Sequence, residues 1–413
     1  MTEWNFAELW EAVADIHPDA PALVHGDRRV SWRSFDRRAD GVAAALLGAG
    51  LGRQAKVAQY LYNGTEYLES FFACLKAGMV PVNTNYRYTE DELVYLWDNA
   101  DVEAVVFDHH FAERVSPLRD RVPKVRMWLC VGGCPDWASP YEDAAASTSS
   151  GRVRAPWGRS GDDLILIYTG GTTGMPKGVM WRQDDLFCLL NRTGELRYDE
   201  HGTLDDARDV LAKPPQHPPP VLVPGPPLMH GTGLFTAISV LDSAGCIVTL
   251  TGRHFSVEEL LDTVEAEKVT ELSIVGDAFA KPILAALDAE PARWDLSSVW
   301  LIISSGVIWS AEVKQGLLRH MPRVLMVDNL GSSEAVGMGR SQTRAGQASA
   351  TAGFKLGPST RVLAEDGSDV VPGSDQPGLV ALRGRGPIGY YKDEEKTAAT
   401  FRYIDGERWT IPG

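Results

Sequence analysis

The stretch that decides the fold is Leu164-Ile165-Leu166-Ile167-Tyr168-Thr169-Gly170-Gly171-Thr172-Thr173-Gly174-Met175-Pro176-Lys177-Gly178-Val179. Its first part is an apolar run typical of a buried strand, and the rest is a loop of glycines and threonines that closes on one lysine. Glycines let backbone N–H groups converge on phosphate oxygens, and hydroxyls add donors. Lys177 supplies a compact positive charge. A surface turn is the alternative, but the length of the motif and its place after a buried strand favour a phosphate-binding loop.

A Walker loop is the nearest competing phosphate motif. It requires GxxxxGK followed by Ser or Thr. Here Lys177 follows Pro176 and precedes Gly178, so the Walker pattern is not met.

Composition and charge narrow the class of protein. The 413 residues are 44% hydrophobic and 23% charged, which is typical of a globular chain with two or three lobes. The net charge of -15 makes nucleic acid an unexpected partner. If the chain binds an anionic nucleotide, it must do so locally, with a glycine-rich pocket, a few cations and Mg²⁺. Five cysteines, an odd and small number, favour a reducing cytoplasm. We find no signal peptide and no apolar run of the ~20 residues that a transmembrane helix needs.

Patterns of helix and strand alternate outward from the motif. A helix capped by Ser31 is expected to run to about Leu47, and another from Thr65 to Ala77 is expected to end at Gly78. Such alternation predicts an α/β fold whose parallel sheet carries helices on its faces. Residues 139–161 are expected to form a surface loop, and the prolines of 213–227 an extended segment.

Five ordered blocks resemble the adenylate-forming superfamily of acyl-CoA synthetases, luciferases and peptide-synthetase adenylation domains. In chain order they are Tyr168–Val179, Pro227–Gly233, Ser304–Val307, Asp328–Glu334 and Gly378–Tyr391. The resemblance implies two helix-flanked, mainly parallel β-sheet subdomains and a small β-barrel-like lobe. It places the intertwined subdomains at 1–160 and 161–330 and the β-rich lobe at 331–413.

The resemblance also implies roles for individual residues, and it names ATP, Mg²⁺ and the co-substrate CoA. The implied catalytic residues are Thr172, Lys177, Glu334 and His230. The implied nucleotide-binding residues are Thr169, Gly170, Gly171, Thr173, Gly174, Gly306, Val307, Asn329, Leu330, Gly331, Ser332 and Ser333. The implied substrate pocket consists of His230, Gly231, Asp277 and Gly306, and the implied metal ligands are Glu334 and Thr173.

The sequence departs from the family pattern at three places. Leu330 stands where an adenine-stacking aromatic residue is usual, and Ser305-Gly306 stands where two glycines are usual. The sequence also ends at Gly413, within a motif, before the segment that in the family carries the hinge, the C-terminal domain and an adenylation lysine. We therefore expect a chain shortened from a longer protein, able to bind ligand but slow to turn over.

Several residues admit a structural interpretation beside the functional one. His230 is either a structural histidine or a residue of the acyl pocket, and its block favours the pocket. Asp277 is either a helix N-cap or the floor of that pocket, with neither favoured. Cys130 and Cys134 have no second pair and no nearby histidine in the sequence, so we interpret them as an ordinary turn, and His109-His110 as a solvated pair.

The resemblance is closest to actinobacterial fatty-acid and steroid- or terpenoid-acid CoA ligases. It rests on Lys177–Arg182, Gly276–Ala278 and Tyr391–Thr397. We expect a ligase that joins a large apolar carboxylic acid first to AMP and then to CoA. Two alternatives stay open: an adenylation unit that serves a carrier protein or a separate partner, and a binding protein with a decayed site. The superfamily occurs as monomers and dimers, so the oligomeric state stays open as well.

Overall fold

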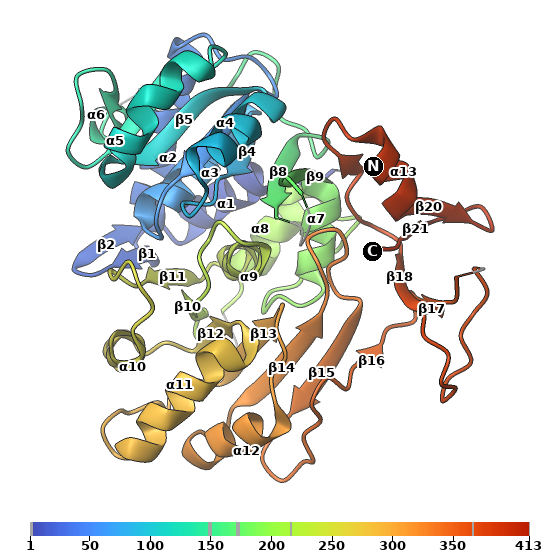
Figure 1. Cartoon of the computed structure of the whole chain (residues 1–413). Helices are drawn as coiled ribbons and strands as arrows, with labels where there is room; N and C mark the ends of the chain where they lie inside the picture. Colours follow the sequence, from blue (N-terminus) through green and yellow to red (C-terminus); the bar gives the residue numbers. More distant parts are fainter. Residues whose placement is uncertain (1–2, 148–150, 171–173, 215–216, 366, 413) are drawn as a thin grey trace.

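The computed structural model describes residues 3–147, 151–170, 174–214, 217–365 and 367–412 (Figure 1). The described residues form two large sheets and one small sheet, with helices between and around them. The predicted α/β fold with a small β-rich lobe is thus confirmed.

The first large sheet has nine strands in the order β16-β15-β14-β13-β12-β10-β11-β1-β2. Its parallel part consists of β14 (Leu325–Leu330), β13 (Leu301–Ser305), β12 (Glu271–Ile274), β10 (Val221–Pro224), β11 (Cys246–Thr249) and β1 (Pro21–His25). Its antiparallel edges are β2 (Arg28–Ser31) on one side and β15 (Gly339–Thr343) with β16 (Lys355–Leu356) on the other.

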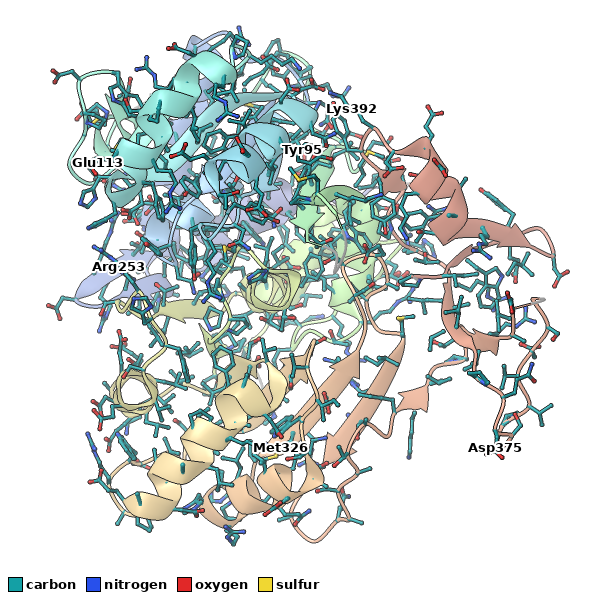
Figure 2. All side chains as sticks on the ribbon, in the orientation of Figure 1. Tyr95, Glu113, Arg253, Met326, Asp375 and Lys392 are labelled. Carbon is teal, nitrogen blue, oxygen red and sulfur yellow. The ribbon has the colours of Figure 1, made fainter. Side chains whose placement is uncertain are left out.

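Helices cover both faces of this sheet. One face packs against α10 (Val257–Ala266), α11 (Gly276–Ala289) and α12 (Ala311–His320). The core there includes Ile302 and Met326, of which Met326 is labelled in Figure 2. The other face packs against α9 (Gly231–Asp242), whose apolar residues belong to the largest core. Because side chains alternate along a strand, neighbours such as Ile302 and Ile303 serve opposite faces.

The second large sheet has eight strands in the order β19-β9-β8-β4-β3-β5-β6-β7. They are β19 (Gly389–Tyr390), β9 (Lys177–Arg182), β8 (Leu164–Thr169), β4 (Val80–Asn83), β3 (Lys56–Tyr60), β5 (Val102–Asp108), β6 (Met127–Val131) and β7 (Ser139–Pro140). One face carries α4 (Glu90–Asn99), η1 (His109–Phe111), α5 (Ala112–Val115) and η2 (Ser116–Arg121). The other shares the largest core with α1 (Phe6–Ile16), α2 (Trp32–Gly48), α3 (Thr65–Ala77), α7 (Gln183–Asn191) and α8 (Leu204–Ala212).

The small sheet is antiparallel, in the order β17-β18-β21-β20. Its strands are β17 (Thr360–Leu363), β18 (Leu379–Arg383), β21 (Glu407–Thr410) and β20 (Phe401–Ile404), and α13 (Glu394–Thr400) precedes β20. Leu363, Ala381, Trp409 and Ile411 form its core.

Local signals explain several element ends. The Ser31 hydroxyl accepts a hydrogen bond from the Ser34 amide at the start of α2, as predicted. The predicted C-cap Gly78 ends α3 at φ 64°, in the left-handed region that glycine tolerates. The expected loop over 139–161 is wrong in part, because β7 and α6 (Tyr141–Ala145) lie within it and Tyr141 is buried.

The chain does not pass from one large sheet to the other at residue 160, the boundary expected between the two subdomains. Strands β8 and β9 lie beyond that boundary and continue the sheet of β3 to β7, while β1 and β2 lie before it and join the other large sheet. None of the helices in the described ranges combines the length and apolar character that crossing a membrane requires.

Candidate active site

A cavity of about 1120 Å³ lies where the carboxyl ends of β8, β13 and β14 meet the start of α9 and the edge of the small sheet. The carboxyl end of a parallel sheet is where ligands bind in open α/β folds. The cavity brings together most of the described residues that the sequence predicted. Those lining it are Thr169, Gly170, His230, Gly231, Gly306, Asn329, Leu330, Gly331, Ser332, Ser333 and Glu334.

The predicted phosphate loop joins β8 to β9. The two strands pair in antiparallel register up to Thr169 and Lys177, so the loop is the turn of a hairpin. Gly178 is required there, because a Cβ atom at this position would lie 2.6 Å from the Tyr168 ring. Gly174, at φ 110°, occupies a backbone conformation that favours glycine. The predicted sites Gly171, Thr172 and Thr173 lie outside the described residues.

Lys177 stands at the start of β9, and its ammonium group is held in an ion pair. Its Nζ atom lies 2.5 Å from Oδ2 of Asp393, beside α13. Lys177 is not among the residues that line the cavity. Its predicted contact with phosphate requires the exchange of this ion pair for a ligand oxygen.

Asn83, at the end of β4, is a site residue that the sequence analysis missed. Its buried amide donates to the carbonyl oxygens of Tyr168 (2.9 Å) and Met229 (2.6 Å), and it accepts from the Tyr168 amide (2.6 Å). One side chain therefore fixes the phosphate loop and the block before His230 relative to each other.

The second block forms the start of α9. A Cβ atom at Gly233 would lie 2.6 Å from the Pro227 carbonyl oxygen, so only glycine allows this close approach of chain to helix. His230 is the N-cap residue and its side chain lines the cavity. Enclosure by the surrounding atoms, and after it the nearby Arg87 guanidinium, lower the pKa of His230 below its usual range. The imidazole is therefore neutral at neutral pH.

The third and fourth blocks lie side by side at the ends of β13 and β14. Ser305 pairs with Asn329 across the two strands. Gly306 follows at φ 91° and turns the chain away, which leaves open backbone at the cavity wall. The predicted nucleotide contacts from both blocks thus share one edge of the sheet.

The loop after β14 presents a carboxylate to the cavity. Backbone hydrogen bonds between Ser332 and Ala335 close this loop. The Tyr390 hydroxyl donates to Oε1 of Glu334 at 2.8 Å, and the Trp181 indole donates to the Ser333 carbonyl oxygen at 2.9 Å. Burial and then the Glu334 carboxylate raise the pKa of Tyr390, so its phenol stays a donor.

The surroundings of Glu334 suit a hard cation. Carboxylate, hydroxyl and carbonyl oxygens are the ligands that Mg²⁺ prefers. Here the half-buried Glu334 lines the cavity beside the hydroxyls of Ser332 and Ser333, and Tyr390 orients its carboxylate.

Of the described residues that the sequence predicted, Gly174, Lys177, Val307 and Asp277 do not line the cavity. Val307 is about half exposed beyond Gly306. Oδ1 of Asp277 accepts from the amide (2.9 Å) and the hydroxyl (3.1 Å) of Ser310, and its Oδ2 pairs with Lys281. Asp277 thus stabilises the turn before α12. Because Val275 is the N-cap of α11, Asp277 is neither the expected helix N-cap nor a residue of the cavity wall.

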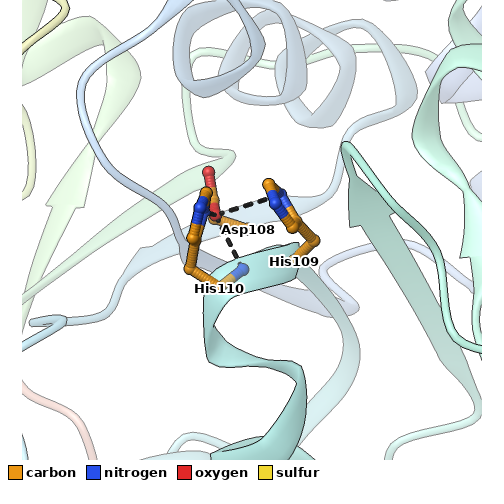
Figure 3. Close-up of side chains that lie close together, drawn as sticks. All are labelled: Asp108, His109 and His110. Atoms are coloured by element: carbon orange, nitrogen blue, oxygen red, sulfur yellow. Dashed lines mark hydrogen bonds and ion pairs between the residues drawn. The ribbon is translucent and has the colours of Figure 1, made fainter.

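A second group of potential metal ligands lies at the end of β5. The ligand atoms of Asp108, His109 and His110 lie within 4.8 Å of one another (Figure 3). The Arg253 guanidinium contacts His110 Nε2, and this positive charge opposes a bound cation. We therefore interpret the group as a polar link between β5 and the loop that holds Arg253.

The His109 ring also packs against Gly132, so a histidine does lie near the Cys130–Cys134 turn.

Comparisons with known proteins agree with this geometry. A family model described as AMP-binding enzyme matches residues 10–391. The medium/long-chain-fatty-acid–CoA/3-oxocholest-4-en-26-oate–CoA ligase of Mycobacterium marinum is 37% identical, over 99% of this chain and 75% of that protein. The 3-oxocholest-4-en-26-oate–CoA ligase of Rhodococcus rhodochrous is 34% identical over the same shares. The N-terminal domain of FACL13 from Mycobacterium tuberculosis superposes with a TM-score of 0.76 at 18% identity, over 99% of this chain and 100% of that one. The chain belongs to the AMP-binding enzyme family, among the acyl-CoA ligases.

Proposed function

We propose that this chain activates a large hydrophobic carboxylic acid, of the long-chain fatty or steroid side-chain class. A carboxylate oxygen attacks the α-phosphorus of ATP, the bond to pyrophosphate breaks, and an acyl-adenylate forms. The thiol sulfur of CoA then attacks the acyl carbonyl, AMP leaves with the bonding electrons, and the thiol proton passes to solvent. The observation that carries the proposal is that one cavity holds the predicted nucleotide contacts at one end and continues along α9. We call this second part, lined by Phe235, Leu301 and Ile303 among others, the channel.

The described residues support distinct roles at the nucleotide end. Backbone at Gly306 and the side chains of Asn329 and Leu330 form the wall for the adenine. Thr169 and Gly170 begin the loop for the phosphates, to which the proposal adds Thr172, Thr173 and Lys177. Preorganised donors of this kind stabilise charge that develops on phosphate oxygens in the transition state.

Glu334 is the proposed ligand of Mg²⁺, together with Thr173. The ion would neutralise charge on the phosphate oxygens of ATP. Tyr390 holds the Glu334 carboxylate in place, and neutral His230 would face the acyl group at the boundary between the two ends of the cavity.

The substrate class rests on the channel and on the relatives. Leu301, Ile303 and Phe235 give its walls apolar surface. The two relatives described above are named for fatty acids and for a steroid side-chain acid.

We also place the enzyme in the cytoplasm, because all five cysteines are free thiols.

A substrate panel tests the proposal. ATP-dependent release of pyrophosphate is measured with long-chain, steroid-side-chain, acetate and amino acid substrates, and the large apolar acids are expected to react best. Preference for acetate or amino acids would contradict it.

A Glu334 variant tests the metal role separately. Glu334→Gln is expected to lower the Mg²⁺-dependent turnover at least roughly a hundredfold, as loss of an electrostatic catalytic group does. Its affinity for a non-hydrolysable acyl-adenylate mimic, measured by calorimetry without Mg²⁺, should change little. An equal loss of turnover and of affinity for the mimic would instead indicate that the substitution damages the fold of the loop.

A further inference from the structure

Glu271 lies at the end of the cavity that is remote from the nucleotide contacts. It begins β12 and is in register with Leu301 of β13, which in turn is in register with Leu325 of β14. All three residues line the cavity, whereas Leu272, the next residue, belongs to the core on the opposite face. The Glu271 side chain is therefore directed into the channel.

The lengths of β13 and α9 give the depth of this channel. Gly306 lies five residues beyond Leu301, which corresponds to roughly 16 Å at the rise of a parallel strand. Helix α9 and its C-cap Ser243 form the facing wall, with a stripe at helical spacing: Thr232, Phe235, Thr236, Ser239, Val240 and Ser243. Its twelve residues span about 18 Å. Both estimates leave room for a long acyl group between the nucleotide contacts and Glu271.

Glu271 is a buried carboxyl without a partner. It is 5% exposed, and within the described part of the chain no hydrogen bond or ion pair to its carboxyl is found. Burial, and after it the Glu195 carboxylate, raise the pKa of Glu271 to about 7. The group is thus partly protonated at neutral pH and able to donate a hydrogen bond.

We propose that Glu271 hydrogen-bonds an oxygen that the substrate carries at the end opposite its carboxylate, such as a ring ketone or a hydroxyl. This inference rests on the proposed function and restricts the proposed class of substrates. A purely apolar tail would cover the Glu271 carboxyl and leave it unsatisfied, which is costly. A distal oxygen would satisfy it at the depth that β13 and α9 define. Glu271 would then select oxygenated acids over plain fatty acids of the same length.

A pair of matched ligands tests the proposal. Two acyl-sulfamoyl adenosines are compared by calorimetry, one with a ketone or hydroxyl at the far end of the acyl group and one with methylene or hydrogen in its place. The wild-type chain is expected to bind the oxygenated ligand about tenfold tighter or more, because a hydrogen-bonding site rejects a ligand that lacks the group. Glu271→Leu should abolish or reverse this preference, and Glu271→Gln, which keeps a donor and an acceptor, should retain most of it.

Glu258→Leu is the matched control, because Glu258 is an exposed carboxylate of α10 that does not line the cavity. Its preference for the oxygenated ligand should stay within about twofold of the wild-type preference. A change of that size is well below the tenfold loss expected for Glu271→Leu. An unchanged preference in Glu271→Leu, or none in the wild type, would overturn the inference and leave the proposed function standing. Failure of the wild type to bind either ligand would instead reject the proposed function. Glu271→Val provides a second apolar variant if the leucine variant does not fold.

Discussion

At the scale of the residue, Asn83 is the clearest case of a side chain that positions others. Its three hydrogen bonds reach the carbonyls of Tyr168 and Met229 and the amide of Tyr168, which belong to two different blocks of the site. Asn83→Ala is expected to lower the free energy of unfolding by about 1–3 kcal/mol, because buried backbone groups lose their partner. It should also weaken binding of the acyl-adenylate mimic several-fold, since the phosphate loop loses its anchor.

Asn99→Ala is the control for this prediction. Asn99 accepts a hydrogen bond from the Tyr168 hydroxyl at 2.6 Å, and its side chain has no hydrogen bond to the described backbone of the loop. Urea denaturation and calorimetry on both variants separate the effects. Equal losses of affinity would contradict a positioning role that is specific to Asn83.

The residues of the site differ in how visible they are in the sequence. Asn329 to Glu334 and Gly306 could be predicted because each set follows an apolar strand within a recognisable block. Asn83 and Glu271 could not, because their significance comes from segments far along the chain: Asn83 bonds residues 85 and 146 positions away. No local pattern encodes such a partner. The direction of Lys177 toward Asp393 likewise depends on a contact across 216 residues.

At the scale of the element, a buried cluster of charges joins α1, α2 and α3. The ammonium group of Lys76 is fully buried and lies 2.9 Å from Glu11, 2.6 Å from Asp36 and 2.9 Å from Asp40. Lys76→Met would leave Asp36 and Asp40 close together without this cation. It is expected to lower the free energy of unfolding by about 3–5 kcal/mol, the cost of breaking a buried pair from one side.

Lys124→Met is the matched control for Lys76. Lys124 also pairs with two aspartates, Asp98 at 3.1 Å and Asp101 at 2.8 Å, but its side chain is 48% exposed. Solvent screens such pairs, so this variant should change stability by about 1 kcal/mol or less. Urea unfolding of both variants measures the difference. Similar losses would show that burial does not strengthen the cluster.

The same cluster makes stability depend on pH. Burial alone would raise the pKa of Glu11, but the hydrogen bond from Arg159 and the charge of Lys76 outweigh it and lower the pKa to about 2. The unfolded value is higher, so the contribution of Glu11 is fully present above the unfolded pKa and is lost as the pH falls toward about 2. Glu11→Gln should cost on the order of 3 kcal/mol at pH 7. The gap between variant and wild type should narrow in urea titrations below about pH 4.5; a constant gap would contradict the prediction.

Element boundaries followed from the sequence where a local rule sets them. Ser31 and Gly78 were predicted from capping chemistry alone, which depends on a few neighbouring residues. Helix α6 was missed because its five residues lie in a stretch of small and polar residues, and burial of Tyr141 beside Glu69 stabilises it from outside. Short elements of this kind depend on tertiary contacts more than on propensity.

At the scale of the whole molecule, the site depends on how the sheets share the chain. Strand β19 comes from the far end of the sequence and pairs with β9, which brings Tyr390 to Glu334 and Asp393 to Lys177. The alternation of strands and helices predicted parallel sheets, but it did not predict which strands are neighbours. That order is set by long-range packing, so the division expected at residue 160 does not follow a sheet boundary.

The last prediction concerns the coupling of the whole fold to its ligand. Gly306 and Gly346 both have positive φ, 91° and 80°, and an added Cβ atom would meet little at either: the nearest atom is 3.8 Å away at Gly306, and nothing lies within 4 Å at Gly346. Alanine at each should therefore cost a similar 1–2 kcal/mol or so of backbone strain without ligand. Only Gly306 lines the cavity, so only Gly306→Ala should change binding.

Thermal unfolding with and without the acyl-adenylate mimic measures this coupling. Ligand at a hundred times its dissociation constant stabilises a folded protein by roughly 2.7 kcal/mol, and each tenfold loss of affinity removes about 1.4 kcal/mol of that effect. Gly346→Ala should keep the full stabilisation because its strain is remote from the ligand. Gly306→Ala should lose half of it or more, since it adds a methyl group and backbone strain at the wall that is proposed to contact the nucleotide. Equal stabilisation of both variants would place the nucleotide away from the carboxyl ends of β13 and β14.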